Sequence, residues 1–322
     1  MSATDDLGVT MGSIMTTFGA QAVGIANIAM DGTVLDTWYP SPLLSHHFDL
    51  PTGTIRLGAQ DLPRKMLNLV RIDEDRMVEQ VAVRTTIEDL DQPPIDAHDV
   101  YLRLHLLSHR MVKPHEINIE GALELLANVV WTNKGPCLAQ NFEEVRVALR
   151  SRGLIHVYGI DKLPRMVDYV VPSDIQITEA ERVRLGAYLA PGTEVLREGY
   201  VAYNAGTLGA GRIEGHLYPG AVLDEGFDLG ISASIVSDKA SNAVRIGKRC
   251  SIGLGSAIVG IDLGDDVTIG SNLILEPSTM VHRVEDDALV RAATLAGISG
   301  VHITHVADRV EPVVIQQQPD PA

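Results

Sequence analysis

The stretch "IGKRCSIGLGSAIVGIDLGDDVTIG", residues 246–270, places an aliphatic residue directly before glycine at Ile246, Ile252, Leu263 and Ile269. The first two of these pairs are six residues apart, and so are the last two. An α-helix repeats about every 3.6 residues and a strand about every two, so neither explains this period. A period of six is typical of a parallel β-helix, in which each side of a triangular coil takes one repeat and the aliphatic side chains stack inside.

The six-residue period extends well beyond this stretch. Aliphatic or small apolar residues fall on it at Val183, Leu189, Val195, Val201, Ile213, Val244, Cys250, Val267 and Leu273. An alternation of strands and helices would need helical stretches between the strands, and residues 183–281 contain none. We therefore expect triangular coils over about residues 173–285, with Ile246, Ile252 and Ile269 facing inward.

Two details of the coils can also be predicted. The glycine after each aliphatic residue suits a corner, where a positive φ is accessible at low cost only without a Cβ atom. Residues 221–243 break the period and are polar, so we expect this stretch to leave the β-helix as a loop.

The N-terminal part has the composition of an ordinary domain of helices and strands. Residues 22–40 predict two strands around the turn Asp31-Gly32, and residues 100–112 predict a mostly buried helix. Two further helices are predicted at 117–131 and 142–153, the second ending at a C-terminal glycine. The chain then divides into an N-terminal domain at 1–150, a β-helix domain at 151–285, and a short C-terminal element with a disordered tail at 286–322.

Composition limits the partners and the location. The 322 residues carry a formal net charge of −16, which argues against a nucleic acid partner. An anionic ligand therefore needs a few local basic groups or backbone N–H groups. Cys137 and Cys250 lie far apart and suit a reducing compartment. The first residues lack a signal peptide, and no stretch approaches the ~20 apolar residues of a membrane span. We expect a soluble, cytoplasmic protein.

Several long motifs resemble one known family. They are "YLRLHLLSHR" at 101–110, "NVVWTNKGPC" at 128–137, "VYGIDKLPRMVDYVVPS" at 157–173, "ERVRLGAYLAPGTEV" at 181–195, "EGYVAYNAGTLGAGRIEG" at 198–215 and "IGKRCSIG" at 246–253. They closely resemble the actinobacterial tetrahydrodipicolinate N-succinyltransferases of the diaminopimelate and lysine biosynthetic pathway. The resemblance implies a homotrimer whose subunits have an α+β N-terminal domain followed by a left-handed parallel β-helix. The left hand is an exception to the rule for crossover connections, and only the resemblance supports it.

The resemblance also implies an activity and its residues. The reaction is succinyl transfer from succinyl-CoA to the amine of the acyclic dicarboxylate formed when tetrahydrodipicolinate opens. Glu214 matches the catalytic glutamate, which acts either as a general base or as an acyl acceptor. Glu181 and Glu198 match carboxylates that bind Mg²⁺ on the trimer axis. The candidates on the succinyl-CoA side are His216, Ser234, Leu254, Gly270, Ser271, Ser278 and Arg291.

Four segments depart from the family pattern. His216 stands where the family has arginine, and "VSDKASNAVR" at 236–245 replaces a glycine-rich stretch. Gly270 and Ser271 replace an acidic–small pair, and "THVA" at 304–307 replaces "RRNS". Arginine is always charged, whereas a histidine in water is largely neutral at pH 7. We therefore expect weaker succinyl-CoA binding than in relatives that keep these motifs, tightening towards about pH 6.

These departures leave a second hypothesis open, namely a trimeric paralogue that has an altered donor or no catalysis and that binds a ligand or partners the true enzyme. The basic residues Lys239, Arg245, Lys248 and Arg249 either meet CoA phosphates or solubilise a loop and one edge of the β-helix. His105 and His109 have the one-turn spacing of metal ligands. They lie in a leucine-rich helix, however, and are interpreted as core or interface histidines.

Overall fold

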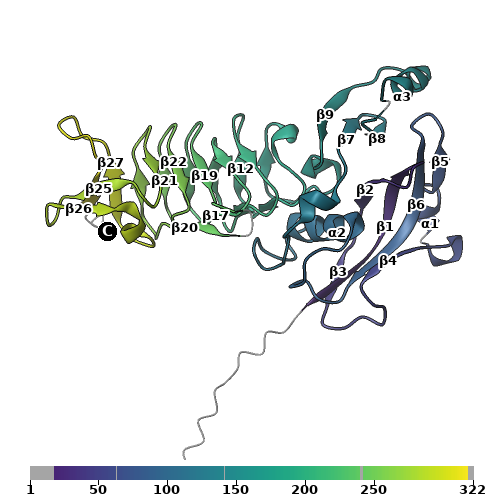
Figure 1. Cartoon of the computed structure of the whole chain (residues 1–322), viewed down its shortest axis with the longest axis horizontal. Coiled ribbons are helices and arrows are strands. Elements are labelled where there is room, and N and C mark those ends of the chain that lie inside the picture. The colour runs from purple at the N-terminus through teal and green to yellow at the C-terminus, as the bar shows by residue number, and fades with distance from the viewer. Residues whose placement is uncertain (1–17, 63, 141, 240–241, 318–322) are drawn as a thin grey trace, which may run out of the picture.

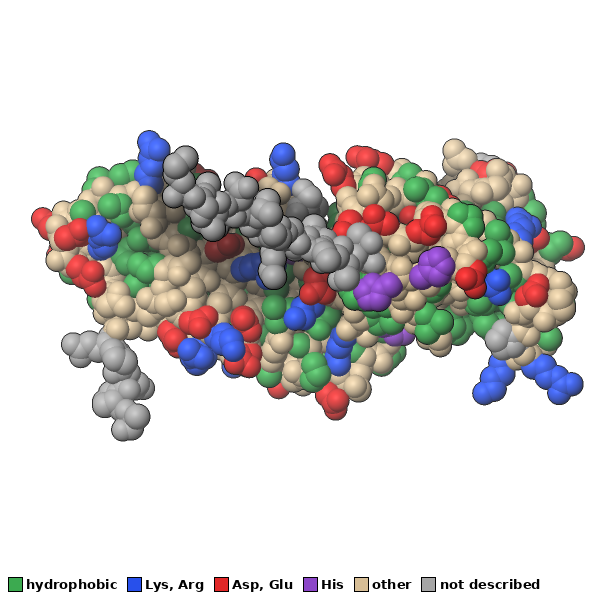
Figure 2. Space-filling model, turned by 90° about the horizontal axis from the view of Figure 1, so that it is seen from below, with side chains coloured by type: hydrophobic (Ala, Val, Ile, Leu, Met, Phe, Trp, Pro, Cys, Tyr) green, Lys and Arg blue, Asp and Glu red, His purple; other side chains and the backbone are tan. Residues whose placement is uncertain are grey.

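The computed structural model describes residues 18–317, apart from 63, 141 and 240–241. An N-terminal domain of sheets and short helices occupies one end of the molecule, and an elongated stack of coils forms the rest (Figure 1). No described helix is both long and apolar enough to cross a membrane. Acidic and basic side chains intermix over the face seen in Figure 2.

A six-stranded antiparallel sheet forms the base of the N-terminal domain. Its order is β2-β1-β6-β4, with β3 paired to β1 and β5 paired to β6. The predicted hairpin around Asp31-Gly32 is confirmed by the pairing of β1 with β2. The strands are β1 (Gly19–Ala29), β2 (Val34–Trp38), β3 (Leu43–Ser45), β4 (Gly53–Arg56), β5 (Arg71–Asp73) and β6 (Val78–Ile87), and short helices η1 (Ala59–Asp61) and α1 (Arg64–Leu67) precede β5.

The predicted buried helix is α2 (Ala97–Ser108), which Asp96 caps by accepting a hydrogen bond from the Asp99 backbone N–H. Every residue of α2 is buried, because the helix lies between the six-stranded sheet and the first coil. His105 is confirmed as a core histidine: its Nδ1 contacts the Tyr101 carbonyl at 2.7 Å, and its Nε2 accepts a hydrogen bond from the Tyr39 backbone N–H. His109, one turn later, is half-buried.

A second, three-stranded sheet connects the domain to the coils, in the order β8-β7-β9. The helix predicted at 117–131 is wrong. Gly121 has a φ of 72° and only the short η2 (Ala122–Leu125) follows it, after which the β-branched and aromatic run at 129–131 pairs as a strand. The helix predicted at 142–153 is confirmed and ends at Gly153, whose φ is 95°. The elements are β7 (Val129–Thr132), β8 (Gly135–Leu138), α3 (Phe142–Leu149), η3 (Arg150–Arg152) and β9 (Val157–Asp161).

The coils form a parallel β-helix with three faces. A residue pairs with one 16 to 18 positions later in most coils, as Gly206 does with Val222 and Tyr188 with Gly206, which corresponds to three repeats of six. The turns η4 (Met166–Asp168) and η5 (Ala180–Arg182) lie at its start. The ten-stranded sheet includes β10 (Gln176–Ile177), β12 (Thr193–Val195), β15 (Gly211–Ile213), β18 (Phe227–Leu229), β21 (Ser251–Ile252), β23 (Thr268–Ile269) and β27 (Val301–Thr304). The five-stranded sheet contains β13 (Tyr200–Val201), β16 (His216–Leu217), β19 (Ser234–Val236), β22 (Ala257–Val259) and β24 (Ile274–Leu275). The four-stranded sheet contains β11 (Tyr188–Leu189), β14 (Gly206–Thr207), β17 (Ala221–Leu223) and β20 (Val244–Ile246).

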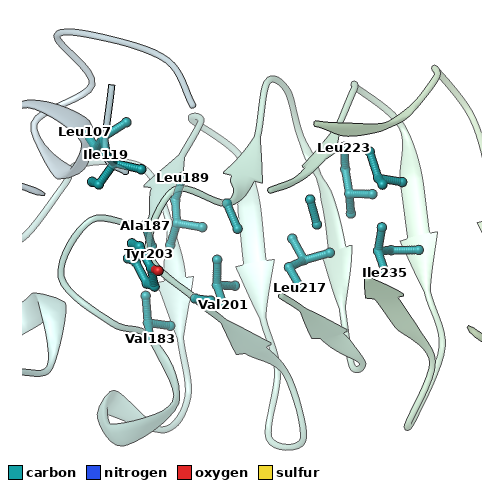
Figure 3. Close-up of a cluster of buried hydrophobic side chains, with 14 of the residues drawn as sticks. Leu107, Ile119, Val183, Ala187, Leu189, Val201, Tyr203, Leu217, Leu223 and Ile235 are labelled. Atoms are coloured by element: carbon teal, nitrogen blue, oxygen red, sulfur yellow. The ribbon is translucent and has the colours of Figure 1, made fainter. Parts of the chain in front are cut away.

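The periodic residues fill the interior, as predicted. Ile246, Ile252 and Ile269 are 1%, 3% and 1% exposed. Figure 3 shows the same arrangement in the first coils, where side chains such as Val201 and Leu217 point inward and continue the apolar column towards Leu107 of α2. Where the period falls on Thr207, its hydroxyl is buried and bonds to the Thr193 hydroxyl at 2.6 Å.

The predicted role of the repeat glycines is wrong. Gly247, Gly253, Gly264 and Gly270 do not have a positive φ; that conformation belongs to residues two positions later in each turn, such as Arg249 and Asn272. The glycines are required instead because successive coils approach closely. A Cβ atom on Gly247 would lie 2.5 Å from the Gly264 backbone.

The loop predicted at 221–243 is also largely wrong. Residues 221–236 supply β17, β18 and β19 to the three faces, and their aliphatic side chains are buried. The period of six continues there out of phase, because the turn at 214–215 is short and gives intervals of 16 residues rather than 18. The extra residues lie only at 237–243, where the pairing interval increases and Ala221 pairs with Val244. Residues 240–241 of that loop lie outside the described residues.

The far end of the β-helix is closed by antiparallel strands. β27 continues the ten-stranded sheet beside β23 and then pairs antiparallel with β28 (Val313–Gln316). β28 also pairs with β25 (Met280–Arg283), which forms a hairpin with β26 (Ala288–Arg291); η6 (Ala292–Leu295) follows this hairpin.

Substitution of a stacked glycine tests the close approach of the coils. Gly247→Ala would force the coil apart by the clash described above and should lower stability by roughly 1–3 kcal/mol, as overpacking does. Gly159→Ala in β9 is the matched control, because a Cβ atom there meets nothing within 4 Å. Thermal unfolding of the two variants should separate them, and equal melting temperatures would contradict the close-packing explanation.

Burial of His105 predicts a loss of stability in acid. Burial lowers the pKa of His105 to about 3. As pH falls from about 6.5 towards 3, the unfolded chain therefore binds a proton that the folded chain does not, and stability falls by up to ~1.4 kcal/mol per pH unit. Melting temperatures measured between about pH 7 and 5 should fall less steeply for His105→Gln than for wild type. The exposed His156 supplies the control His156→Gln, and an unchanged slope for His105→Gln would refute the assignment.

Candidate functional site

One edge of the β-helix gathers most of the predicted site residues. We call it the glutamate edge; it consists of the turns that lead from the ten-stranded to the five-stranded sheet, at 178–182, 196–199, 214–215, 230–233, 253–256 and 270–273. Of the predicted residues, these turns carry Glu181, Glu198, Glu214, Leu254, Gly270 and Ser271. His216 and Ser234 begin strands that leave the same edge and pair with each other across neighbouring coils.

Glu214 lies between β15 and β16, where its backbone N–H donates to the Leu229 carbonyl of the next coil. Its side chain is 25% exposed, so a ligand can reach it. Arg212, two residues earlier, holds the carboxylate at 2.5 Å, and this hydrogen bond raises the pKa of the Arg212 guanidinium. The arginine therefore orients the carboxylate while leaving part of it open to solvent.

Glu181 and Glu198 each contact an arginine within the single chain, and both side chains remain more than half exposed. Arg165 contacts Glu181 at 3.0 Å, and Arg182 contacts Glu198 at 3.4 Å. Each guanidinium contacts one carboxylate oxygen, and its positive charge opposes the binding of a cation at that oxygen. Within the described ranges, no group of three or more His, Cys, Asp or Glu residues could hold a metal.

Ser278 and Arg291 lie away from the glutamate edge. Ser278 is in the turn that follows β24, where its hydroxyl donates to the Glu276 carboxylate at 2.7 Å. Arg291 ends β26 and pairs with Met280 in the C-terminal hairpin. An open cavity of about 600 Å³ lies near Ser278, on the edge between the five-stranded and four-stranded sheets; it is lined by His115, Asp238, Asn242, Ala243, Val244, Val259, Gly260 and Pro277.

Two of the four predicted basic residues have structural partners. Lys248 contacts Glu225 at 2.9 Å, and Arg249 makes a two-pronged contact with Asp266 of the next coil. Both lie on the edge that leads from the four-stranded to the ten-stranded sheet, and their ion pairs favour the interpretation as surface residues of an edge over contact with CoA phosphates. Lys239 and Arg245 are exposed in the loop at 237–243 and on β20.

Sequence reasoning missed two tyrosines beside His216. Tyr200 pairs with His216 across coils, and Tyr218 follows His216 on the same face. The centroid of the His216 ring lies 6.2 Å from that of Tyr200 and 6.3 Å from that of Tyr218. A period-two alternation would have placed Tyr218 beside His216, but finding Tyr200 required the coil length.

Comparisons with known proteins give a consistent result. A family model described as "Tetrahydrodipicolinate N-succinyltransferase middle" matches residues 126–165, and one described as "Hexapeptide repeat of succinyl-transferase" matches residues 243–277. A Salinispora tropica protein named 2,3,4,5-tetrahydropyridine-2,6-dicarboxylate N-succinyltransferase is 45% identical over 215 residues, which are 66% of this chain and 66% of the relative. A Pseudomonas putida protein of the same name is 32% identical over 303 residues, which are 86% of this chain and 88% of the relative.

Solved structures support the same architecture. A crystal structure from Campylobacter jejuni, provisionally named a 2,3,4,5-tetrahydropyridine-2-carboxylate N-succinyltransferase, matches with a TM-score of 0.77. It covers 92% of this chain and 91% of its own, at 23% identity, and so supports the fold alone. Because the identity to the Pseudomonas putida relative extends over most of both chains, this protein belongs to the tetrahydrodipicolinate N-succinyltransferase family.

Proposed function

We propose that this protein transfers the succinyl group of succinyl-CoA to the amine of the dicarboxylate formed from tetrahydrodipicolinate, a step of diaminopimelate and lysine biosynthesis. The main support is the position of Glu214, a partly exposed carboxylate that Arg212 orients on the edge where most of the donor-side candidates gather. The names of the relatives point to the same reaction. Neither the relatives nor the geometry favours the non-catalytic alternative.

The chemistry needs a group that takes a proton. In the direct route the amine nitrogen attacks the thioester carbonyl carbon, the N–C bond forms, the C–S bond breaks, and Glu214 accepts the amine proton while the departing CoA thiolate takes up a proton. In the two-step route the Glu214 carboxylate attacks the thioester first and the C–S bond breaks to release CoA. The amine then attacks the mixed anhydride, and the bond from the acyl carbon to the Glu214 oxygen breaks. Mass measurement after incubation with succinyl-CoA alone distinguishes the two roles, because only the second leaves the acyl group on the protein.

Replacement of Glu214 tests the assignment. Glu214→Gln keeps the size of the side chain but cannot accept a proton, so turnover should fall by roughly 10²–10⁴-fold while CoA binding persists. Glu225→Gln, an exposed glutamate on a different edge, is the matched control and should retain full activity. Release of free CoA thiol measures turnover, and wild-type turnover in Glu214→Gln would refute the role.

We also propose a left-handed homotrimer with each active site between neighbouring β-helices. The partly exposed position of Glu214 supports this, because a ligand on the outer surface of one chain is enclosed only if a second chain covers it. The boundaries at 150 and 285 are kept as proposed domain limits. Free, buried Cys137 and Cys250 support a reducing, cytoplasmic location.

The ion pairs of Glu181 and Glu198 with arginine lead to a prediction about whether the trimer depends on Mg²⁺. If these ion pairs persist in the assembly, no Mg²⁺ is needed, and light scattering should give the mass of three chains with or without EDTA. Arg182→Ala, which removes the partner of Glu198, is the comparison variant in which Mg²⁺ should begin to affect the melting temperature. A monomer at micromolar concentration would contradict the trimer. Dissociation of the wild-type trimer by EDTA would show instead that a bound metal ion holds it together.

A further inference from the structure

Three rings gather on the outer face of the five-stranded sheet, around the strand that begins two residues after Glu214. The centroids of Tyr200, His216 and Tyr218 lie 6.2, 6.3 and 6.4 Å apart in the three pairings. The His216 ring meets both tyrosine rings edge to face, at 83° and 90°, which is a favourable arrangement for aromatic groups. Tyr218 is 42% exposed, so the cluster is open to solvent and is not part of the core. We call these three residues the aromatic wall.

Beyond the wall, towards the C-terminus, smaller side chains replace the rings on the same face. Ser234 and then Ala257 follow His216 in register on the next two coils. Val236 and then Val259 follow Tyr218, whose backbone N–H bonds to the Ile235 carbonyl. We call Ser234, Val236, Ala257 and Val259 the lane. It is half-buried and mostly apolar, and Val259 also lines the cavity of about 600 Å³ at the far edge of this face.

The wall carries polar groups on both tyrosines and on His216. Among the described residues, neither the Tyr200 nor the Tyr218 hydroxyl makes a hydrogen bond to another side chain or to the backbone. Each phenol can donate one hydrogen bond, and the imidazole ring N–H can donate another. The wall therefore presents up to three donors, and none of them is a permanently charged arginine.

We propose that the aromatic wall determines which acyl group the enzyme accepts, by hydrogen-bonding the terminal carboxylate of the donor's acyl chain. The inference rests on the proposed function. Glu214 lies two residues before His216, so a thioester beside Glu214 with its CoA portion along the lane directs the acyl group at the three rings. An acyl chain that ends in a carboxylate accepts hydrogen bonds from the phenol and imidazole groups of the wall. An acyl chain that ends in a methyl group displaces water from these groups without accepting a hydrogen bond in its place.

Binding to the assembled protein tests the proposal, with succinyl-CoA, butyryl-CoA and CoA as the three probes in isothermal titration. Butyryl-CoA has the same carbon chain with a methyl group in place of the carboxylate. Wild type should favour succinyl-CoA over butyryl-CoA, and Tyr218→Phe should reduce this ratio by roughly tenfold through the loss of one hydrogen bond to a charged group. Tyr200→Phe should act in the same way, with CoA binding unchanged in both.

The control is Tyr158→Phe, which alters an equally exposed tyrosine in β9. Because the ratio is measured within each variant, a partial loss of folded protein cancels. If the ratio of succinyl-CoA to butyryl-CoA affinity is unchanged in both wall variants, or if either variant dissociates the trimer, the proposed role of the wall is refuted while the proposed function stands. If wild type binds none of the three probes, the proposed function itself fails.

Discussion

A parallel β-helix has an open first coil, and the structure depends on how helix α2 covers it. A bare end would expose the apolar interior and leave backbone groups without partners. Leu104 of α2 packs against Gly186 so closely that a Cβ atom on this glycine would lie 2.4 Å away. Ser108 donates to the Ala187 carbonyl and accepts from the Gly186 N–H, so one hydroxyl satisfies both groups. As a result, the N-terminal sheet, α2 and the coils share one hydrophobic core.

This dependence explains what the sequence could predict. The period of six identified the inward residues because each coil repeats the same burial, whatever its neighbours are. The same reasoning failed at 221–236, because the preceding turn at 214–215 is short and shifts the phase of the period although the coils continue. It also assigned the wrong role to the repeat glycines, since close contact between coils is a tertiary effect that the sequence of one strand does not reveal. The false helix at 117–131 arose from an apolar pattern that fits both a helix and a strand.

The candidate site was predictable to the extent that motifs mark it. Glu214, His216 and Ser234 came from the resemblance, and the structure places them on one edge of neighbouring coils. Motifs did not show that arginines contact Glu181 and Glu198, because each arginine lies 16 residues before its partner and meets it only in the folded chain. Tyr200 was missed for a similar reason: it meets His216 only through the interval of one coil.

The regular stacking of coils has a consequence for how such an enzyme can diverge. Each coil adds about 4.8 Å, the spacing of neighbouring strands, so the distance from Glu214 to the C-terminal strands can change only in whole steps. Side chains on the outer face, in contrast, can be exchanged one at a time without moving the coils. The length of surface available to a bound acyl donor and the chemical groups that contact the end of its acyl chain are therefore separate traits. The first is set by counting coils, and the second by a few residues on one of them.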